Sequence, residues 1–196
     1  MAEDVIVRGG LLEVRFVFAA DRWGHRLSIV DGSTAVPLLE SIEGAPRDIW
    51  PASPSLQEVT LQDRSSERAV ATALGACGSS HFAVSLQIVT DRSATAEYTT
   101  RVEIDVACRV QSRPPSIGSA YRLMPGVALR QSQLHVGGRC LDLHTAENTN
   151  LLVEASTGIR LTPVEIEPGL PATLRWQYAI AITDAVDTVW HDPSRR

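Results

Sequence analysis

The chain has 196 residues, of which 44% are hydrophobic and 21% are charged, and its formal net charge is −5. This balance indicates a globular protein, and an acidic chain without a basic cluster argues against nucleic acid or an anionic membrane as a partner. All 18 basic residues are arginine, so Schiff-base chemistry, a phosphate-loop lysine and a lysine general base are excluded.

Alternation of apolar and polar residues with a period of two dominates the chain from its beginning. In the segment 11–20, LLEVRFVFAA, one face carries Leu12, Val14, Phe16 and Phe18, while Glu13 and Arg15 take the other. Such alternation predicts a half-buried strand. Further strands are predicted at 25–32, 56–62, 81–90, 97–110, 133–144, 150–156, 158–166 and 174–182.

Two segments admit a helical alternative. Residues 65–75, SSERAVATALG, begin with a serine that could cap a helix and end at a glycine, but Val70, Thr72 and Leu74 alternate. We therefore predict a strand there. The segment 33–44, STAVPLLESIEG, could hold a short helical turn.

Two proline-rich stretches, residues 44–55 and 111–119, interrupt the alternation. Proline removes a ladder hydrogen-bond donor, so both are predicted to be loops. Neither is flanked by a change in composition. We predict a single all-β domain spanning 1–196, an antiparallel β-sandwich of two packed sheets with proline-rich rim loops and little helix.

The four tryptophans differ in their predicted surroundings. Trp176 lies on an inward face of a predicted strand, whereas Trp23, Trp50 and Trp190 lie outside the clear strand cores. Trp50 is predicted to fold at least partly onto the sandwich as a plug, because burying an indole ring is favourable. Trp23 is the candidate ligand-facing ring, with polar neighbours that could bind a hydroxyl-rich ligand: Asp21, Arg22, His25 and Arg26.

A glycine pair at 137–138 predicts a two-residue hairpin turn in the segment 131–144. His135, Cys140, Asp142 and His144 would then share one face, and all four side chains are possible zinc ligands. Cys140 and His144 would stand about 13 Å apart along the strand, too far for one ion. We predict a solvated polar face without a bound metal, although convergence of the four residues is left open.

Two other groups of residues could carry chemistry. Cys77, Ser79, Ser80 and His81 crowd a glycine-rich turn, which a hairpin connection also requires. Glu97, Glu103 and Asp105 form a carboxylate row with Arg101 and Arg109. Two carboxylates two residues apart, about 6.6 Å between Cα atoms, could form the acid/base pair of a glycosidase, but interspersed arginines favour a solvated strand face.

The three cysteines, Cys77, Cys108 and Cys140, are irregularly spaced. We predict that they are unpaired, that Cys108 is buried, and that the protein is cytoplasmic. The start, MAEDVIVRGG, lacks the features of a secretory signal, and no apolar stretch is long enough to span a membrane. No cofactor is expected, because dinucleotide, phosphate-loop and calcium-loop patterns are absent.

Two functions from different classes remain open. The first is a non-catalytic β-sandwich that binds a carbohydrate, another small polar ligand or a protein partner through rim loops holding Trp23 and Trp50. The second is a sugar-processing enzyme that uses His25, His81 or the patch around His135 with a carboxylate partner. An enzyme needs at least two such groups at the floor of one pocket.

Overall fold

The computed structural model describes residues 2–45, 48–65, 68–92, 98–154, 158–164 and 169–184. These residues form fifteen strands and contain no helix, and the strands build two packed antiparallel sheets. The predicted all-β sandwich is therefore confirmed. No helix with the length and hydropathy needed to cross a membrane occurs in the described part of the chain.

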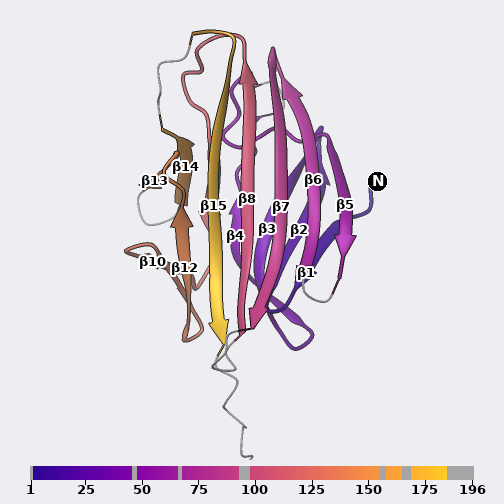
Figure 1. Cartoon of the computed structure of the whole chain (residues 1–196), viewed down its shortest axis with the longest axis vertical. Coiled ribbons are helices and arrows are strands. Elements are labelled where there is room, and N and C mark those ends of the chain that lie inside the picture. Colours follow the sequence, from indigo (N-terminus) through magenta and orange to yellow (C-terminus); the bar gives the residue numbers. More distant parts are fainter. Residues whose placement is uncertain are drawn as a thin grey trace, which may run out of the picture.

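The first sheet has seven strands, and its two ends are the edge strands β1 and β13. Figure 1 shows β1 to β4 behind the longer strands of the second sheet. In spatial order the seven strands are β1 (Val5–Gly9), β2 (Leu12–Ala19), β3 (Arg22–Asp31), β4 (Thr34–Ser41), β9 (Ser119–Leu123), β14 (Gly158–Pro163) and β13 (Thr149–Glu154).

The second sheet has eight strands, and the three longest of them, β15, β8 and β7, lie side by side in its middle (Figure 1). In spatial order the eight strands are β10 (Ala128–Arg130), β11 (Gln133–Val136), β12 (Arg139–Thr145), β15 (Ala172–Asp184), β8 (Tyr98–Val110), β7 (Ser80–Arg92), β6 (Arg68–Cys77) and β5 (Glu58–Arg64).

The core lies between the two sheets and follows the alternation of the sequence. On β8, residues 100 to 110 alternate between buried and half-exposed or exposed, so that Val102, Ile104 and Val106 face the other sheet. Trp176 on β15 is fully buried in the same core, as predicted. The two sheets therefore share one continuous apolar layer.

The structure decides the two segments that admitted a helical alternative. Residues 68–77 form β6, so the predicted strand is confirmed. The helical turn suggested for 33–44 is wrong, because residues 34–41 form β4. Pro37 is tolerated in that strand because the pairing of β3 with β4 shifts register between Leu27 and Ser28, beside the proline. Strands β1, β9 and β10 were not predicted.

The first proline-rich stretch lies within a longer connection, residues 42–57, which we call the strap. It leads from β4 in the seven-stranded sheet to β5 in the eight-stranded sheet. The Leu56 carbonyl accepts a hydrogen bond from the Trp23 backbone N–H (2.7 Å), and the Gln57 N–H donates to the Leu74 carbonyl (2.9 Å). The strap thus bonds to β3 in one sheet and to β6 in the other.

The second proline-rich stretch connects β8 to β9 at the same end of the sandwich, and we call residues 111–118 the open loop. Its residues Arg113, Pro115 and Ser116 are exposed. Ile117 packs against the core and anchors the loop before β9 begins. The two predicted rim loops therefore exist, but they differ in how closely they pack.

Candidate functional site

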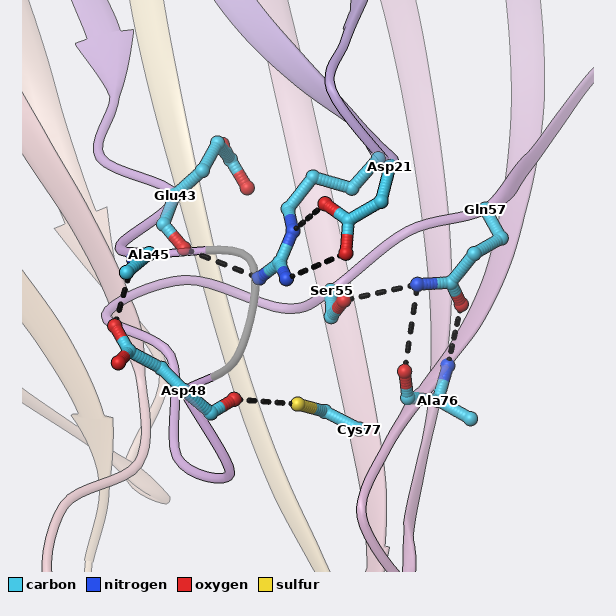
Figure 2. Close-up of polar contacts among 9 residues, drawn as sticks. Asp21, Glu43, Ala45, Asp48, Ser55, Gln57, Ala76 and Cys77 are labelled. Carbon is cyan, nitrogen blue, oxygen red and sulfur yellow. Dashed lines mark hydrogen bonds and ion pairs between the residues drawn. The ribbon is translucent and has the colours of Figure 1, made fainter.

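The turn between β2 and β3 places Asp21 and Arg22 against the strap. Arg22 is buried. Its guanidinium donates two hydrogen bonds to the Asp21 carboxylate (2.8 and 3.1 Å) and one to the Glu43 backbone carbonyl (3.3 Å). Figure 2 labels the two acceptor residues, Asp21 and Glu43. These bonds to Asp21 raise the pKa of Arg22 and lower the pKa of Asp21. Arg22, held by Asp21, therefore joins the strap to the seven-stranded sheet through its hydrogen bond to Glu43.

Toward the eight-stranded sheet, two further side chains bind backbone groups: Gln57, at the end of the strap, and Cys77, at the end of β6 (Figure 2). The Gln57 side chain accepts a hydrogen bond from the Ala76 N–H (2.6 Å) and donates one to the Ala76 carbonyl (3.3 Å). The Cys77 thiol donates to the Asp48 carbonyl. A side-chain amide here takes the place of a strand partner at the end of β6.

Trp23 lies in β3 with only 8% of its surface exposed. Its indole N–H donates to the Gln57 carbonyl (3.2 Å), and its ring packs edge-on against Phe18. The prediction that Trp23 lies outside the strand cores is therefore wrong. Strand β3 begins at Arg22, three residues before the predicted strand, because residues 22–24 pair with residues 17–19 of β2. The strap adds a bridge on the other side, from Leu56 to Trp23.

The other predicted rim tryptophan, Trp50, is half-buried and packs against the core. The predicted partial burial of this ring on the sandwich is confirmed. Trp190 lies outside the described residues.

His25 points inward and begins a hydrogen-bonded chain across the sandwich. Its Nε2 lies 2.7 Å from the Tyr121 hydroxyl, which lies 2.5 Å from the hydroxyl of Tyr178 in the other sheet. Burial lowers the pKa of His25 to about 4 and raises those of both tyrosines, so the imidazole is neutral at pH 7. Its Nδ1 has no hydrogen-bond partner among the described residues.

Glu43 lies where the strap leaves β4, close to the backbone of β3. One carboxylate oxygen accepts a hydrogen bond from Ser41, whose hydroxyl also accepts the His25 backbone N–H (2.7 Å). The other oxygen is buried without a partner among the described residues. Burial raises the pKa of Glu43 to about 7, because a charged carboxylate is poorly solvated there.

Arg26, the fifth predicted ligand residue, is exposed and forms an ion pair with Glu40 (2.7 Å), which also binds Arg122. The five predicted residues therefore do not converge on one cleft. Trp23 and His25 point into the core, Arg22 binds the strap, and Arg26 lies on the outer face of the sheet. Whether any of them contacts a ligand stays a prediction.

The hairpin predicted at 137–138 has the expected register, with His135 opposite Cys140. Both glycines adopt positive φ angles (55° and 81°), as a tight hairpin turn requires. Asp142 accepts a hydrogen bond from Gln133 (2.8 Å). Within the described ranges, no three His, Cys, Asp or Glu side chains are grouped closely enough to hold a metal ion.

The residues of the glycine-rich turn point to different surroundings. Ser80 is buried, whereas His81 is exposed and lies between Ala76 and Arg109 in the sheet register. Cys77 bonds to the strap backbone. The three cysteines are free and Cys108 is fully buried, as predicted, and burial raises the pKa of Cys108 to about 12.

A hollow of about 390 Å³ lies on the outer face of the eight-stranded sheet, and we call it the sheet hollow. Its lining comes from four neighbouring strands, β7, β8, β15 and β12. The register places Gln87, Glu103, Ala179 and His144 in one row across these strands. The small side chain of Ala179 lies between two longer polar ones, so the face is hollowed there.

Arginines hold both carboxylates of the sheet hollow in place. Asp105 forms a two-bonded ion pair with Arg175 (2.8 Å for the Nε–Oδ1 contact), which lowers the pKa of Asp105. Glu103 accepts hydrogen bonds from Arg101 and from Gln87. The predicted carboxylate row is therefore a charge-paired strand face, and its third member, Glu97, lies outside the described residues.

The sequence contained part of the signal for this hollow. Alternation placed Glu103 and Asp105 on one face and Asp142 and His144 on another, but only β15, pairing with β8 on one side and β12 on the other, brings the two faces together. The chain matches no protein-family model and no curated protein, so its function has to be argued from this geometry.

Proposed function

We propose that this protein is a non-catalytic β-sandwich module that binds a small hydroxyl-rich ligand, such as a monosaccharide or another polyol, in the sheet hollow. One observation carries the proposal: a concave site in the middle of a rigid sheet gathers acceptors and donors from four strands. Ser85, Gln87, Glu103, Asp105, Gln177 and His144 line it. Hydroxyl groups need such closely spaced acceptors and donors.

The ion pairs support binding because they fix the carboxylates before a ligand arrives. A carboxylate oxygen that already accepts one hydrogen bond can accept another from a sugar hydroxyl. Asp105 and Glu103 are oriented by Arg175 and Arg101, so little conformational entropy is lost on binding. The aromatic residue at the hollow, Tyr178, is buried, which favours a compact polar ligand over a glycan that stacks on an exposed ring.

The surroundings of Trp23 beside the strap support a ligand site less well than the sheet hollow does. The indole N–H of Trp23 and the guanidinium of Arg22 both bind the strap or its flanks. A ligand would have to displace these buried hydrogen bonds, which is costly.

A filling substitution tests the proposal. Ala179→Leu places a larger side chain in the sheet hollow. The control Ala83→Leu, on β7, places a leucine on the same outer face of the sheet but outside the hollow. Saturation-transfer NMR against a set of monosaccharides and polyols identifies the ligand, and titration gives its affinity. We expect Ala179→Leu to weaken binding at least tenfold and Ala83→Leu to leave it unchanged.

Two results would overturn the proposal. One is that none of these ligands binds at millimolar concentration. The other is that a ligand binds equally well to Ala179→Leu and to the wild-type protein.

Glycoside hydrolysis is the second candidate, because the sheet hollow gathers Glu103, Asp105 and His144. A glycosidase of this kind needs one protonated carboxyl as general acid. Asp105 is held ionised by Arg175, which lowers its pKa, and this argues against that role. Release of nitrophenol from aryl glycosides by the wild-type protein, abolished in Glu103→Gln, would favour the enzyme over the binding module.

A further inference from the structure

A second concave site lies at the end of the sandwich, between the open loop and the hairpin of β13 and β14. It has a volume of about 650 Å³, and we call it the rim groove. The open loop contributes Arg113 and Ile117, the hairpin contributes Leu152 and Arg160, and the start of β15 and the residues before it contribute Leu174 and Leu170. It shares no lining residue with the sheet hollow.

Several large apolar side chains are exposed in the walls of the rim groove. Leu152 is 50% exposed and Leu170 is 45% exposed, and Val164, also in the lining, is exposed too. Scattered exposed apolar residues are ordinary, but several gathered around one concavity indicate a surface that a partner or ligand covers. The prolines of the open loop, Pro114 and Pro115, extend the same wall.

Two arginines are the charged side chains in this lining. Arg160 lies 2.9 Å from the Glu154 carboxylate, which balances its charge. Arg113 is exposed on the open loop, and no hydrogen bond or ion pair joins it to another described residue. The groove therefore combines apolar walls with one guanidinium that is available to an anion.

We propose that the rim groove binds an apolar carboxylate of small-molecule size. The apolar body of this ligand would lie against Leu152, Leu170 and Leu174, and its carboxylate would accept paired hydrogen bonds from the Arg113 guanidinium. Guanidinium matches the planar geometry of a carboxylate and binds it with two parallel bonds.

The volume favours a small molecule over a protein segment as the occupant. Small-molecule sites commonly have volumes of about 300–1,000 Å³, and the rim groove falls in this range. An extended peptide would instead pair with the open edge of β13 through backbone hydrogen bonds, and it would need no positive charge at Arg113.

The experiment is a titration of the full chain with decanoate carrying ¹³C in its carboxyl group, below its micelle concentration. Four proteins are compared: wild type, Arg113→Gln, Leu152→Ser and the control Arg130→Gln, which changes an exposed arginine on β10. We expect saturable binding, weakened about tenfold or more by Arg113→Gln and by Leu152→Ser, and unchanged by Arg130→Gln. The alcohol 1-decanol, which has the same chain and no charge, should bind at least tenfold more weakly than decanoate.

Three results would overturn the proposal: no saturable binding of decanoate up to about 1 mM (a Kd that corresponds to about −4 kcal/mol), equal binding of decanoate and decanol, or equal binding by Arg113→Gln and wild type. Binding of a strand-forming peptide in place of decanoate would also overturn it. Ala179→Leu, which fills the sheet hollow, should not alter decanoate binding, so the two proposed sites succeed or fail independently.

Discussion

The strap and the open loop have similar compositions and lie at the same end of the sandwich, yet they pack in opposite ways. Pro51, Pro54 and the serine between them are buried in the strap, whereas Pro115 and Ser116 are exposed in the open loop. The Ser53 hydroxyl donates to the Ala120 carbonyl and accepts its N–H, at 3.0 and 3.1 Å. Proline content therefore predicts a loop without predicting whether that loop is part of the core.

The difference follows from what each connection has to replace. Beyond the end of β4, the backbone of Ala120 in β9 is bonded by the strap: its carbonyl accepts the Ile42 N–H (2.9 Å), and the Ser53 hydroxyl binds both its carbonyl and its N–H. The open loop runs from β8 to β9 with Pro115 exposed and Pro114 half-buried. A connection that has to satisfy buried backbone groups becomes rigid, and one that does not is left available for binding.

The largest expected effect comes from crowding the strap. A Cβ added at Gly75 would lie 1.7 Å from the Ser55 carbonyl oxygen, so Gly75→Ala must displace the strap. We expect it to lower the free energy of unfolding by about 3 kcal/mol, the upper part of the range for overpacking. Gly169→Ala, where no heavy atom lies within 4 Å of the new Cβ, is the control. Equal urea midpoints for the two variants would show that the strap is not tightly seated.

Removing the half-buried ring of the strap should cost less. Trp50 packs against the core without being fully enclosed, so Trp50→Ala should lower the free energy of unfolding by about 2 kcal/mol, below the value of about 3–5 for fully buried aromatic rings. Leu56→Ala, in the fully buried part of the strap, should cost at least as much. A change below 0.5 kcal/mol for Trp50→Ala, typical of surface substitutions, would contradict the assignment of this ring as a plug.

The buried acid of the strap should appear in the pH dependence of stability. Burial holds Glu43 protonated up to about pH 7, so its contribution to stability is lost as pH rises from 4.5 to 7. His25, with its pKa lowered to about 4, acts in the opposite direction, because the unfolded chain gains a proton below pH 6.5 and the folded chain does not. Between pH 4.5 and 6.5, Glu43 therefore lowers the free energy of unfolding as pH rises, and His25 raises it.

Glu43→Gln removes the loss of stability that Glu43 causes as pH rises. The free energy of unfolding of the variant should rise between pH 4.5 and 6.5 and then remain level. Relative to wild type it should gain on the order of 2–3 kcal/mol between pH 4.5 and 7.5. Denaturant titrations at several pH values measure this, with Glu147→Gln, an exposed carboxylate, as the control. Parallel curves for Glu43→Gln and wild type would contradict the prediction.

The reactivity of the thiols tests whether the strap covers Cys77. Cys140 is exposed, Cys77 is half-buried with its thiol bonded to the strap, and Cys108 is fully buried with a raised pKa. A disulfide reagent should therefore modify Cys140 first, Cys77 at least tenfold more slowly, and Cys108 only after denaturation. In Gly75→Ala, the rate at Cys77 should approach that at Cys140. An unchanged Cys77 rate in that variant would mean that the strap does not shield the thiol.

The smallest expected effect lies in the open loop. Pro115 is exposed there, so Pro115→Ser should change the free energy of unfolding by less than about 0.5 kcal/mol, chiefly through the entropy of the unfolded chain. Pro54→Ser in the strap, where the proline is buried, should cost more than 1 kcal/mol, because it also removes apolar packing. Similar changes at both positions would remove the distinction between the two loops.

Local alternation was sufficient to predict the sandwich and most of its strands. It failed where tertiary contacts decide the structure. Trp23 is buried because the strap pairs with it at Leu56 and accepts its indole N–H at Gln57, whereas its polar neighbours suggested an exposed ring. The short strand β10 has only three residues, too few for a periodic signal.

The polar contacts of the interior could not be predicted from the sequence, for a related reason. Tyr121, the partner of His25, lies 96 positions later in the chain. Alternation could place each residue on an inward face but could not pair them. The sheet hollow likewise needed the order of β8, β15 and β12, which no local pattern contains.

The position of β15 between β8 and β12 also bears on how the protein reaches its fold. Val110 pairs with Ala172, 62 positions later, and the ladder continues to Tyr98 and Asp184. A chain under synthesis therefore carries β8 with one long hydrogen-bonding edge open until β15 emerges. Such non-local pairing slows folding and leaves an apolar edge exposed to other chains. Completion of the eight-stranded sheet must wait for β15, which follows its seven other described strands in the sequence.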